Sequence, residues 1–339
     1  MPTTWTQTSL SRVIHADNLE ILPGLPAAAF TLIYLDPPFN TGRVQKRQTT
    51  SAVRSTTLPT SGASGASGAS GASRASGASE ASEASEARGA RAAGTIIGFK
   101  GQRYERIKGD LLGYDDQFED YWAFLEPRLI EAWRLLADDG TLYLHLDYRE
   151  AHYAKVLLDA LFGRDCFLNE LIWAYDYGAK SKNRWPTKHD TILVYVKNPA
   201  TYYFDSTSVD REPYMAPGLV TPEKVARGKL PTDVWWHTIV SPTGKEKTGY
   251  PTQKPVGILR RIIQASSREG DWVLDFFAGS GTTGSVAASL GRRFVLIDQN
   301  PESIKVMRAR LGPRPDAAFL PGREGLPEVE FLDPRADLA

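Results

Sequence analysis

The sequence predicts an α/β protein built on a mostly parallel sheet, with helices on both faces and irregular insertions. Two expected strands lie near the N-terminus, at residues 12–17 and 30–35, and a short amphipathic segment joins them. Two more, at 272–275 and 294–298, alternate with helical patterns near the C-terminus. Strands that alternate with helices build parallel sheets, because each helix crosses one face of the sheet to reach the next strand.

The chain between these ends continues the alternation. Leu125, Leu129 and Leu136 belong to an apolar pattern at helical spacing, and the residues Asp138 to Gly140 mark the end of that helix. The expected elements, in order, are a helix over about 122–136, a strand at 141–146, a helix at about 150–161, strands at about 168–175 and 191–196, and a helix at about 254–267.

Three segments depart from this pattern. A Gly-Ala-Ser repeat at about 61–91 has no aromatic or large aliphatic residue. It cannot bury enough apolar surface to offset its ordering entropy, so we predict a disordered insertion at about 50–95. Residues 205–248 have no clear period and suggest an irregular module, and residues 313–339 suggest a tail. The remaining parts, 1–204 and 249–312, are expected to form one core.

The composition narrows the class of protein. Forty basic and forty acidic residues cancel, so binding to a polyanion would depend on local patches. The strongest patch is a loop, without acidic neighbours, that carries Lys180, Lys182, Arg184 and Lys188. No apolar run is long enough for a membrane span, and no secretory signal is evident, so we expect a cytoplasmic protein.

The single cysteine, Cys166, excludes an internal disulfide and makes a thiolate metal site implausible, and we predict no metal. It lies between Asp165 and Phe167 rather than after a proline, where the nucleophile of a C5-cytosine methyltransferase typically lies. We interpret Cys166 as a packing residue. A mechanism through a covalent cysteine adduct is therefore not expected.

A glycine-rich turn follows the expected strand 272–275. The stretch from Phe276 to Gly284 has the spacing Gly-x-Gly-x-x-Gly, and Asp298 ends the next strand about twenty residues later. Glycines permit close approach of the backbone to a nucleotide-type cofactor, and a carboxylate can accept hydrogen bonds from ribose hydroxyls. Asp275, just before the turn, suits a cofactor with a positive amino group, such as S-adenosylmethionine. A tight turn without any ligand is the alternative.

A second motif, Asp36-Pro37-Pro38-Phe39, follows the apolar strand 30–35, where α/β sheets place their ligands. An aromatic amine is a poor nucleophile because its lone pair is delocalised into the ring. A carboxylate and a proline carbonyl that accept its two N–H bonds would direct the lone pair at a sulfonium methyl. Phe39 could stack on a base flipped out of a duplex. The alternative is a loop without further function.

The two motifs in this order resemble those of the β-group of DNA amino-methyltransferases, in which the catalytic motif precedes the cofactor motif. Other stretches resemble the same family: Leu142-Tyr-Leu-His-Leu-Asp147, Asn169-Glu-Leu-Ile-Trp173, Asp233-Val-Trp-Trp236 and Gly249-Tyr-Pro-Thr-Gln-Lys-Pro255. The similarity covers most of residues 12–312 outside the repeat. It implies a Rossmann-like methyltransferase fold in permuted order, with seven strands of which one is antiparallel.

The resemblance also implies roles for individual residues. Asp36, Pro37, Pro38 and Phe39 are expected to hold the target amine. The residues expected to bind S-adenosyl-L-methionine are Asp17, Thr252, Lys254, Asp275, Phe277, Ala278, Gly279, Ser280, Gly281, Thr282 and Asp298. Asp17 is the least specific of these, because an acid after a short strand is often a helix cap. Residues 205–248 are the candidate target-recognition region, and the basic loop would contact phosphates.

The expected reaction is methylation of an exocyclic amine in double-stranded DNA, with adenine N6 favoured by Asp at position 36. Cytosine N4 presents the same geometry and stays open, as do RNA or protein amines, which the motif order disfavours. A nicotinamide-dependent dehydrogenase would share the glycine turn but leave Asp36 to Phe39 unexplained. A nucleic-acid-binding protein with a decayed site is a further alternative. A homodimer and a cognate restriction endonuclease are compatible with the sequence.

Overall fold

The computed structural model describes residues 10–39, 121–178, 180–241, 243–312 and 328–334, and the backbone of short strands between residues 45 and 114. The chain divides into two compact units. The first contains residues 1–45 and 113–339, and the second contains residues 46–112. The division into a core of residues 1–204 and 249–312 with a separate recognition region stays a prediction.

The first unit is built on one nine-stranded sheet, in the order β11-β9-β10-β8-β2-β12-β13-β1-β14. The strands are β1 (Ser11–His15), β2 (Phe30–Leu35), β8 (Leu136–Leu146), β9 (Phe167–Ala174), β10 (His189–Val196), β11 (Val234–Trp236), β12 (Trp272–Asp275), β13 (Arg293–Asp298) and β14 (Val329–Leu332). All neighbours in this sheet pair in parallel except β10, which is antiparallel to both β8 and β9. The predicted mostly parallel sheet with one antiparallel strand is therefore confirmed.

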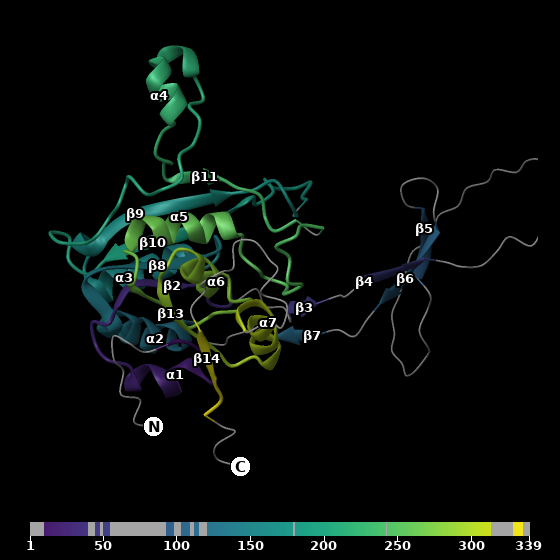
Figure 1. Ribbon diagram of the computed structural model, residues 1–339, viewed down its shortest axis with the longest axis horizontal. Coiled ribbons are helices and arrows are strands. Elements are labelled where there is room, and N and C mark those ends of the chain that lie inside the picture. Colours follow the sequence, from purple (N-terminus) through teal and green to yellow (C-terminus); the bar gives the residue numbers. More distant parts are fainter. Residues whose placement is uncertain are drawn as a thin grey trace, which may run out of the picture. The chain divides into compact units, whose positions relative to one another are not determined.

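Helices cover both faces of this sheet (Figure 1). They are α1 (Asn18–Ile21), α2 (Tyr121–Leu135), α3 (Ala151–Phe162), α5 (Val256–Ser266), α6 (Thr282–Ser289) and α7 (Pro301–Leu311), while α4 (Pro222–Arg227) lies in the segment before β11. One core cluster joins α2 and α3 to the sheet, and a second joins α5, α6 and α7 to it. Side chains of β2 point alternately to the two faces of the sheet and so contribute to both clusters. Ile33 and Leu35 belong to the first cluster, while Leu32 and Tyr34 belong to the second.

Two edge strands extend the sheet beyond the seven strands predicted. At one edge β11 pairs with β9, inside the segment 205–248 that was expected to be irregular. At the other edge β14 pairs with β1, so the prediction of a tail over 313–339 is wrong for residues 329–332. Both strands are short, and β14 is only partly buried, so neither has the apolar run by which a sequence pattern reveals a strand.

The predicted boundary between the second helix and its following strand is also wrong. The helix α2 ends at Leu135, and β8 begins at Leu136, before the Asp138 to Gly140 stretch read as a helix end. Phe30 pairs with Leu136 before an irregularity in the register of β2 and β8. The early residues of β8 therefore belong to the sheet.

The second unit contains a three-stranded antiparallel sheet, β4-β6-β5, formed by Thr50–Arg54, Arg103–Lys108 and Ala93–Ile97. The strands β3 (Gln45–Arg47) and β7 (Leu112–Tyr114) form a separate pair. Residues 50–54 and 93–95 of the predicted disordered insertion are thus strands. The Gly-Ala-Ser repeat itself lies outside the described residues.

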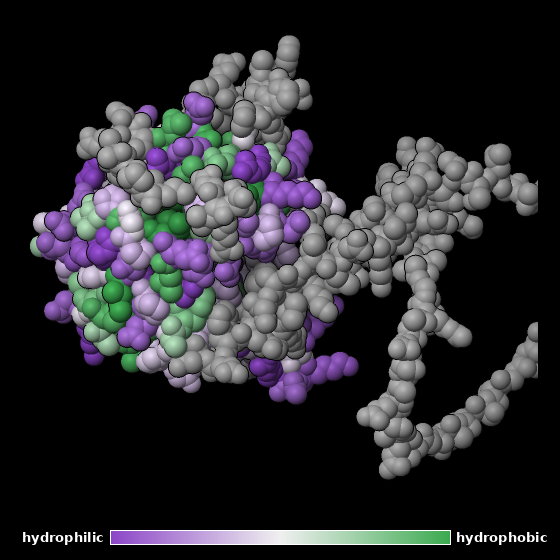
Figure 2. Space-filling model, turned by 90° about the horizontal axis from the view of Figure 1, so that it is seen from below, coloured by the Kyte–Doolittle hydropathy of each residue, from purple (hydrophilic) through white to green (hydrophobic). Residues whose placement is uncertain are grey.

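Hydrophilic and hydrophobic residues are interspersed on the face of the first unit that Figure 2 shows. Among the described residues, no helix has both the length and the apolar character to cross a bilayer.

Cys166 packs against the first core cluster, and burial together with Asp165 raises the pKa of its thiol. A thiol with a raised pKa is a poor nucleophile, which agrees with its interpretation as a packing residue.

Candidate active site

A cavity of about 370 Å³ opens at the carboxyl ends of β1, β2, β12 and β13, where parallel sheets bind ligands. The predicted site residues that line it are Asp17, Asp36, Pro38, Thr252, Lys254, Asp275, Phe277, Ala278, Gly279, Ser280, Thr282 and Asp298. The two motifs meet here because β2 and β12 are neighbours in the sheet, although they lie far apart in the sequence. Pro37, Phe39 and Gly281 do not line this cavity.

The glycine-rich turn folds over the end of β12. Gly279 and Gly281 have φ values of +51° and +70°, a region that other residues rarely adopt, and Gly281 caps the start of α6. A Cβ at Gly281 would lie 2.7 Å from the side chain of Met307, so Gly281 serves the packing of the turn against α7. The Thr282 hydroxyl donates to the Lys254 carbonyl (3.1 Å), which ties the turn to the segment before α5.

Gly284, inside α6, lies against β13 without room for a side chain. A Cβ there would lie 2.6 Å from Leu296 and 3.1 Å from Phe294, both fully buried. We expect Gly284→Val to lower the free energy of unfolding by about 1–3 kcal/mol, through overpacking of the second core cluster. Denaturant titration would measure this change. Gly218→Val is the matched control, because nothing lies within 4 Å of its Cβ position; an equal loss in both variants would contradict the packing argument.

Two acids face the cavity from the ends of β12 and β13, of which Asp275 is buried and Asp298 half-buried. Asp275 accepts hydrogen bonds from the Thr283 hydroxyl (2.6 Å) and the Phe277 amide (3.0 Å). Burial nevertheless raises the pKa of Asp275 to about 7, and the charges of Asp36 and Asp298 add to this effect. Asp298 accepts from the Gly279 amide at 2.7 Å, and burial raises its pKa as well. Buried carboxylates that lack a cation favour a ligand that brings positive charge.

At the end of β1, Asp17 is the N-cap of α1 and accepts a hydrogen bond from the Leu19 amide (2.9 Å). It also lines the cavity and lies 3.4 Å from Arg128, so its capping role and a binding role coexist. Arg128 donates to the Asn18 side chain at 2.7 Å and lies over the ring of Phe124. Arg128, Asn18 and Phe124 also line the cavity, and no sequence motif marked them.

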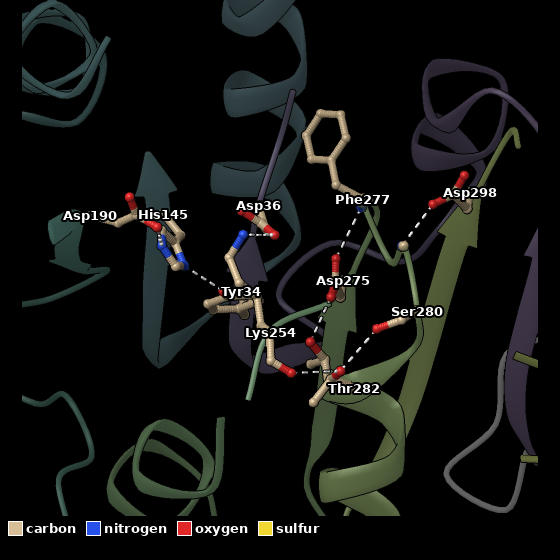
Figure 3. Close-up of polar contacts among 12 residues, drawn as sticks. Tyr34, Asp36, His145, Asp190, Lys254, Asp275, Phe277, Ser280, Thr282 and Asp298 are labelled. Carbon is tan, nitrogen blue, oxygen red and sulfur yellow. Dashed lines mark hydrogen bonds and ion pairs between the residues drawn. The ribbon is translucent and has the colours of Figure 1, made fainter. Parts of the chain in front are cut away.

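Asp36, directly after β2, forms an ion pair with Lys254 (Figure 3). The Nζ atom of Lys254 lies 2.6 Å from Oδ2 of Asp36, and the two side chains are only 10 % and 15 % exposed. The other carboxylate oxygen, Oδ1, is buried, and no described residue donates a hydrogen bond to it. A buried acceptor without a hydrogen bond costs free energy, unless a bound ligand donates a hydrogen bond to it. The Tyr121 hydroxyl donates to the Pro38 carbonyl at 2.8 Å.

A buried hydrogen-bond chain that sequence reasoning missed lies beside Asp36 (Figure 3). Burial is the main cause that raises the pKa of Tyr34 well above its usual value, so Tyr34 donates to Nδ1 of His145 (2.7 Å). Nε2 of His145 then donates to Asp190 (3.3 Å), which also accepts from Tyr175 (3.0 Å). Burial works to raise the pKa of Asp190, but His145 and Lys254 outweigh it and keep the carboxylate charged. The ring of His145 packs against Phe39.

A second cavity, of about 730 Å³, lies on the other side of the segment 250–254. Trp173 and Tyr175 line it, while Tyr250, Thr252 and Lys254 line both cavities. The segment 250–254 is therefore a shared wall. A cavity lined by aromatic side chains is suited to a flat ring.

The basic loop borders this second cavity through Gly178 and Thr187. Lys180, Lys182 and Arg184 are exposed, as the sequence predicted. Lys188 has an acidic neighbour, since its Nζ lies 3.7 Å from the carboxylate of Asp176. The prediction of a loop without acidic neighbours is therefore wrong for this residue. Trp185, between the basic residues, is 93 % exposed.

Comparison with known proteins gives a consistent result. The model of a family described as DNA methylase, of the N6/N4 type, matches residues 30–309. Type II methyltransferase M.HpaI of Haemophilus parainfluenzae is 33% identical over 196 residues, which cover 57% of this chain and 60% of that protein. DNA adenine methyltransferase YhdJ of Escherichia coli K12 is 28% identical over 88% of this chain and 82% of its own.

Solved structures share the fold. The PvuII DNA methyltransferase, described as cytosine-N4-specific, has a TM-score of 0.55 and 14% identity, over 91% of this chain and 89% of its own. TTHA0409 of Thermus thermophilus, a putative DNA modification methylase solved with S-adenosyl-L-methionine, has a TM-score of 0.50 and 19% identity, over 96% and 99% of the two chains. These similarities confirm the predicted fold class.

Proposed function

The chain belongs to the N6/N4 DNA methylase family, and we propose that it transfers a methyl group from S-adenosyl-L-methionine to the exocyclic amine of a base in double-stranded DNA. Adenine N6 is the favoured acceptor. M.HpaI and YhdJ, the relatives described above, support a DNA substrate, and YhdJ is named as a DNA adenine methyltransferase. The match with M.HpaI spans about 60% of that protein's length, so substrate and partners are part of the proposal.

The observation that carries the proposal is the buried Oδ1 of Asp36, which has no donor among the described residues. An amine N–H of the target base would complete it, while the ion pair with Lys254 holds the carboxylate in place. Tyr121 already donates to the Pro38 carbonyl, and we assign the second amine hydrogen to a carbonyl of the pair Pro37 and Pro38. Two acceptors on one amine turn its lone pair out of conjugation with the ring, which is what makes it nucleophilic.

The cavity fits the cofactor on the evidence of its own residues. When bound, S-adenosyl-L-methionine supplies an electrophilic methyl group on a sulfonium. Asp275 and Asp298 line the cavity, and we assign to them the positive ammonium group and the ribose hydroxyls respectively. Gly279 leaves space in the cavity between the turn and the ring of Tyr250, because a Cβ at this position would lie 3.3 Å from that ring. The remaining predicted cofactor residues stay part of this proposal.

The first test is incubation of the purified protein with unmethylated genomic DNA and methyl-labelled S-adenosyl-L-methionine, followed by mass spectrometry of the nucleosides. We expect labelled N6-methyladenine. Labelled N4-methylcytosine would keep the mechanism and change the base. DNA from several genomes guards against a missing target site, and the absence of label from all of them would refute a DNA substrate. Sequencing of the methylated positions then gives the recognition site.

The basic loop is proposed to hold DNA phosphates. Combined replacement of Lys180, Lys182 and Arg184 by alanine should weaken binding to any duplex and lower the slope of log affinity against log salt by about 2–3, since each contact contributes about 0.9. Fluorescence anisotropy at several salt concentrations would measure this slope. Lys305→Ala, an exposed charge on α7, is the control and should leave the slope unchanged. An unchanged slope in the triple variant would place the phosphate contacts elsewhere.

The proposal has consequences for partners and location. Residues 205–248, with β11 and α4, remain the proposed target-recognition region. A DNA substrate in a bacterial host implies a cytoplasmic enzyme, and type II relatives make a cognate restriction endonuclease a proposed partner. A homodimer is likewise a proposal, which sedimentation of the purified protein would test.

A further inference from the structure

Lys254 presents unused hydrogen-bond donors at the site of the reactive carboxylate. Its ammonium group carries three N–H donors, and its one short contact with a described side chain is to Oδ2 of Asp36 at 2.6 Å. The side chain lines both the cofactor cavity and the aromatic cavity, so the ammonium lies where the two meet. It also lies 4.8 Å from the centroid of the Phe39 ring.

The ion pair therefore offers a donor next to an acceptor. Oδ1 of Asp36 is a buried acceptor without a donor among the described residues, and the Lys254 ammonium beside it is a donor. Adenine has the complementary edge, because its N6 amine is a donor and the neighbouring N1 is an acceptor. Cytosine has the same arrangement in N4 and N3. The edges of guanine and thymine place an N–H at the ring position, which an ammonium cannot satisfy.

We propose, on the basis of the function proposed above, that Lys254 binds the ring nitrogen beside the target amine and so selects adenine or cytosine in the active site. Asp36 accepts from the amine while Lys254 donates to N1 of adenine. A base stacked on Phe39 lies about 3.5 Å from that ring. The Lys254 ammonium lies over the Phe39 ring, 4.8 Å from its centroid, so it borders the space that a base beside Asp36 would enter.

The surroundings of Lys254 support a role that depends on its charge and position. Asp36 and Asp190 are the acids that act on it, and Asp190 is held in place by His145 and Tyr175. The Thr282 hydroxyl fixes the backbone carbonyl of Lys254, so the base of the side chain is anchored to the glycine-rich turn. A lysine that only neutralised Asp36 would leave the enzyme indifferent to the ring nitrogen, and this difference can be measured.

The test uses duplex oligonucleotides that contain the recognition site, with the target adenine replaced by 1-deazaadenine or by 3-deazaadenine and with an abasic site opposite it, so that loss of N1 does not change the cost of breaking a base pair. The first analogue loses N1, and the second loses N3 but keeps N1, so it is the matched control. We expect the wild-type enzyme to bind the 1-deaza duplex about 10-fold to 100-fold more weakly than the adenine duplex, the range of a hydrogen bond to a charged group. Binding of the 3-deaza duplex should change little.

The same three duplexes are then tested with Lys254→Met and Lys254→Arg. Binding is measured in the presence of S-adenosylhomocysteine, so that an inactive variant still gives a result, and calorimetry of this ligand confirms that each variant is folded. The methionine variant should bind adenine and 1-deazaadenine equally, while arginine should restore part of the discrimination.

Equal binding of both duplexes by the wild type, or full discrimination by Lys254→Met, would overturn the role of Lys254 while methylation of adenine leaves the proposed function intact. Failure of the wild type to methylate the adenine duplex would instead refute the proposed function, and the inference with it. If mass spectrometry identifies cytosine as the target, 3-deazacytosine takes the place of 1-deazaadenine.

Discussion

Replacement of Asp36 by alanine should lower the rate of methyl transfer by about 10³-fold, the upper range seen when one fixed polar contact to a reacting group is removed. The carboxylate is proposed to hold the target amine rather than the cofactor, so affinity for S-adenosyl-L-methionine should change much less than the rate. Asp36→Asn is the more specific variant, because it keeps the shape of the side chain but replaces one of the two acceptor oxygens by an NH₂ donor. That NH₂ group would face either Lys254 or the target amine, and both of these are donors. Single-turnover assays with labelled cofactor would measure the rate, and calorimetry the affinity.

Asp298→Ala is the contrasting variant. Asp298 lies at the end of β13 and lines the same cavity, and its proposed partners are the ribose hydroxyls. We expect this change to weaken cofactor binding, while transfer at saturating cofactor is largely retained. A wild-type rate in Asp36→Ala, which removes the acceptor, would refute the proposed mechanism. A loss of cofactor binding in Asp36→Asn equal to that in Asp298→Ala would show that the two acids share one role.

The second large effect concerns pH. The pKa of Asp275 is raised to about 7, mainly by burial and further by Asp36 and Asp298, so the carboxyl group is half protonated near neutral pH. An incoming cation favours the charged carboxylate, and binding below pH 7 must therefore release the proton. Affinity for S-adenosyl-L-methionine should rise as pH rises, by about tenfold between pH 6 and pH 8 for a single linked proton.

Calorimetry in buffers of different ionisation enthalpy would count the proton released at each pH. Asp275→Asn removes the titrating group but keeps the hydrogen bond to the Phe277 amide, so this variant should bind the cofactor more weakly and with a flatter pH dependence. Thr283→Val is the companion variant, because it removes a hydrogen bond that lowers the pKa of Asp275. Its affinity curve should shift to higher pH. A wild-type curve that is flat, or that falls as pH rises, would contradict the linkage.

Much of the fold could be predicted because its signals are local. The strand β2 is a continuous apolar run, and Asp36, Asp275 and Asp298 each stand at or just after the end of such a run. Parallel strands bring their carboxyl ends to one edge, so the meeting of these acids followed from the strand pattern. The order of the two motifs predicted the family and its permuted strand order.

What the sequence did not reveal depends on contacts across the sheet. The chain from Tyr34 through His145 to Asp190 joins β2, β8 and β10, and each member looks like an ordinary strand residue in its own segment. The pair of Lys254 with Asp36 is hidden for the same reason. Lys254 was expected only at the cofactor pocket, because no pattern within one segment shows which side chain of another strand it will reach.

The strand order has a consequence for synthesis of the protein on the ribosome. The inner partners of β1 and β2 include β13 and β12, which are made late in translation. The residues between Leu35 and Trp272 take roughly 10–50 s to translate at about 5–20 residues per second, and until then the apolar strand Phe30–Leu35 lacks one of its neighbours. Nascent chains therefore expose the unpaired, apolar edge of β2, and we expect chaperones to bind it. These chains also hold only half of the residues that line the cavity at the ends of β1, β2, β12 and β13, so the proposed methyl transfer requires that translation of β12 and β13 be complete.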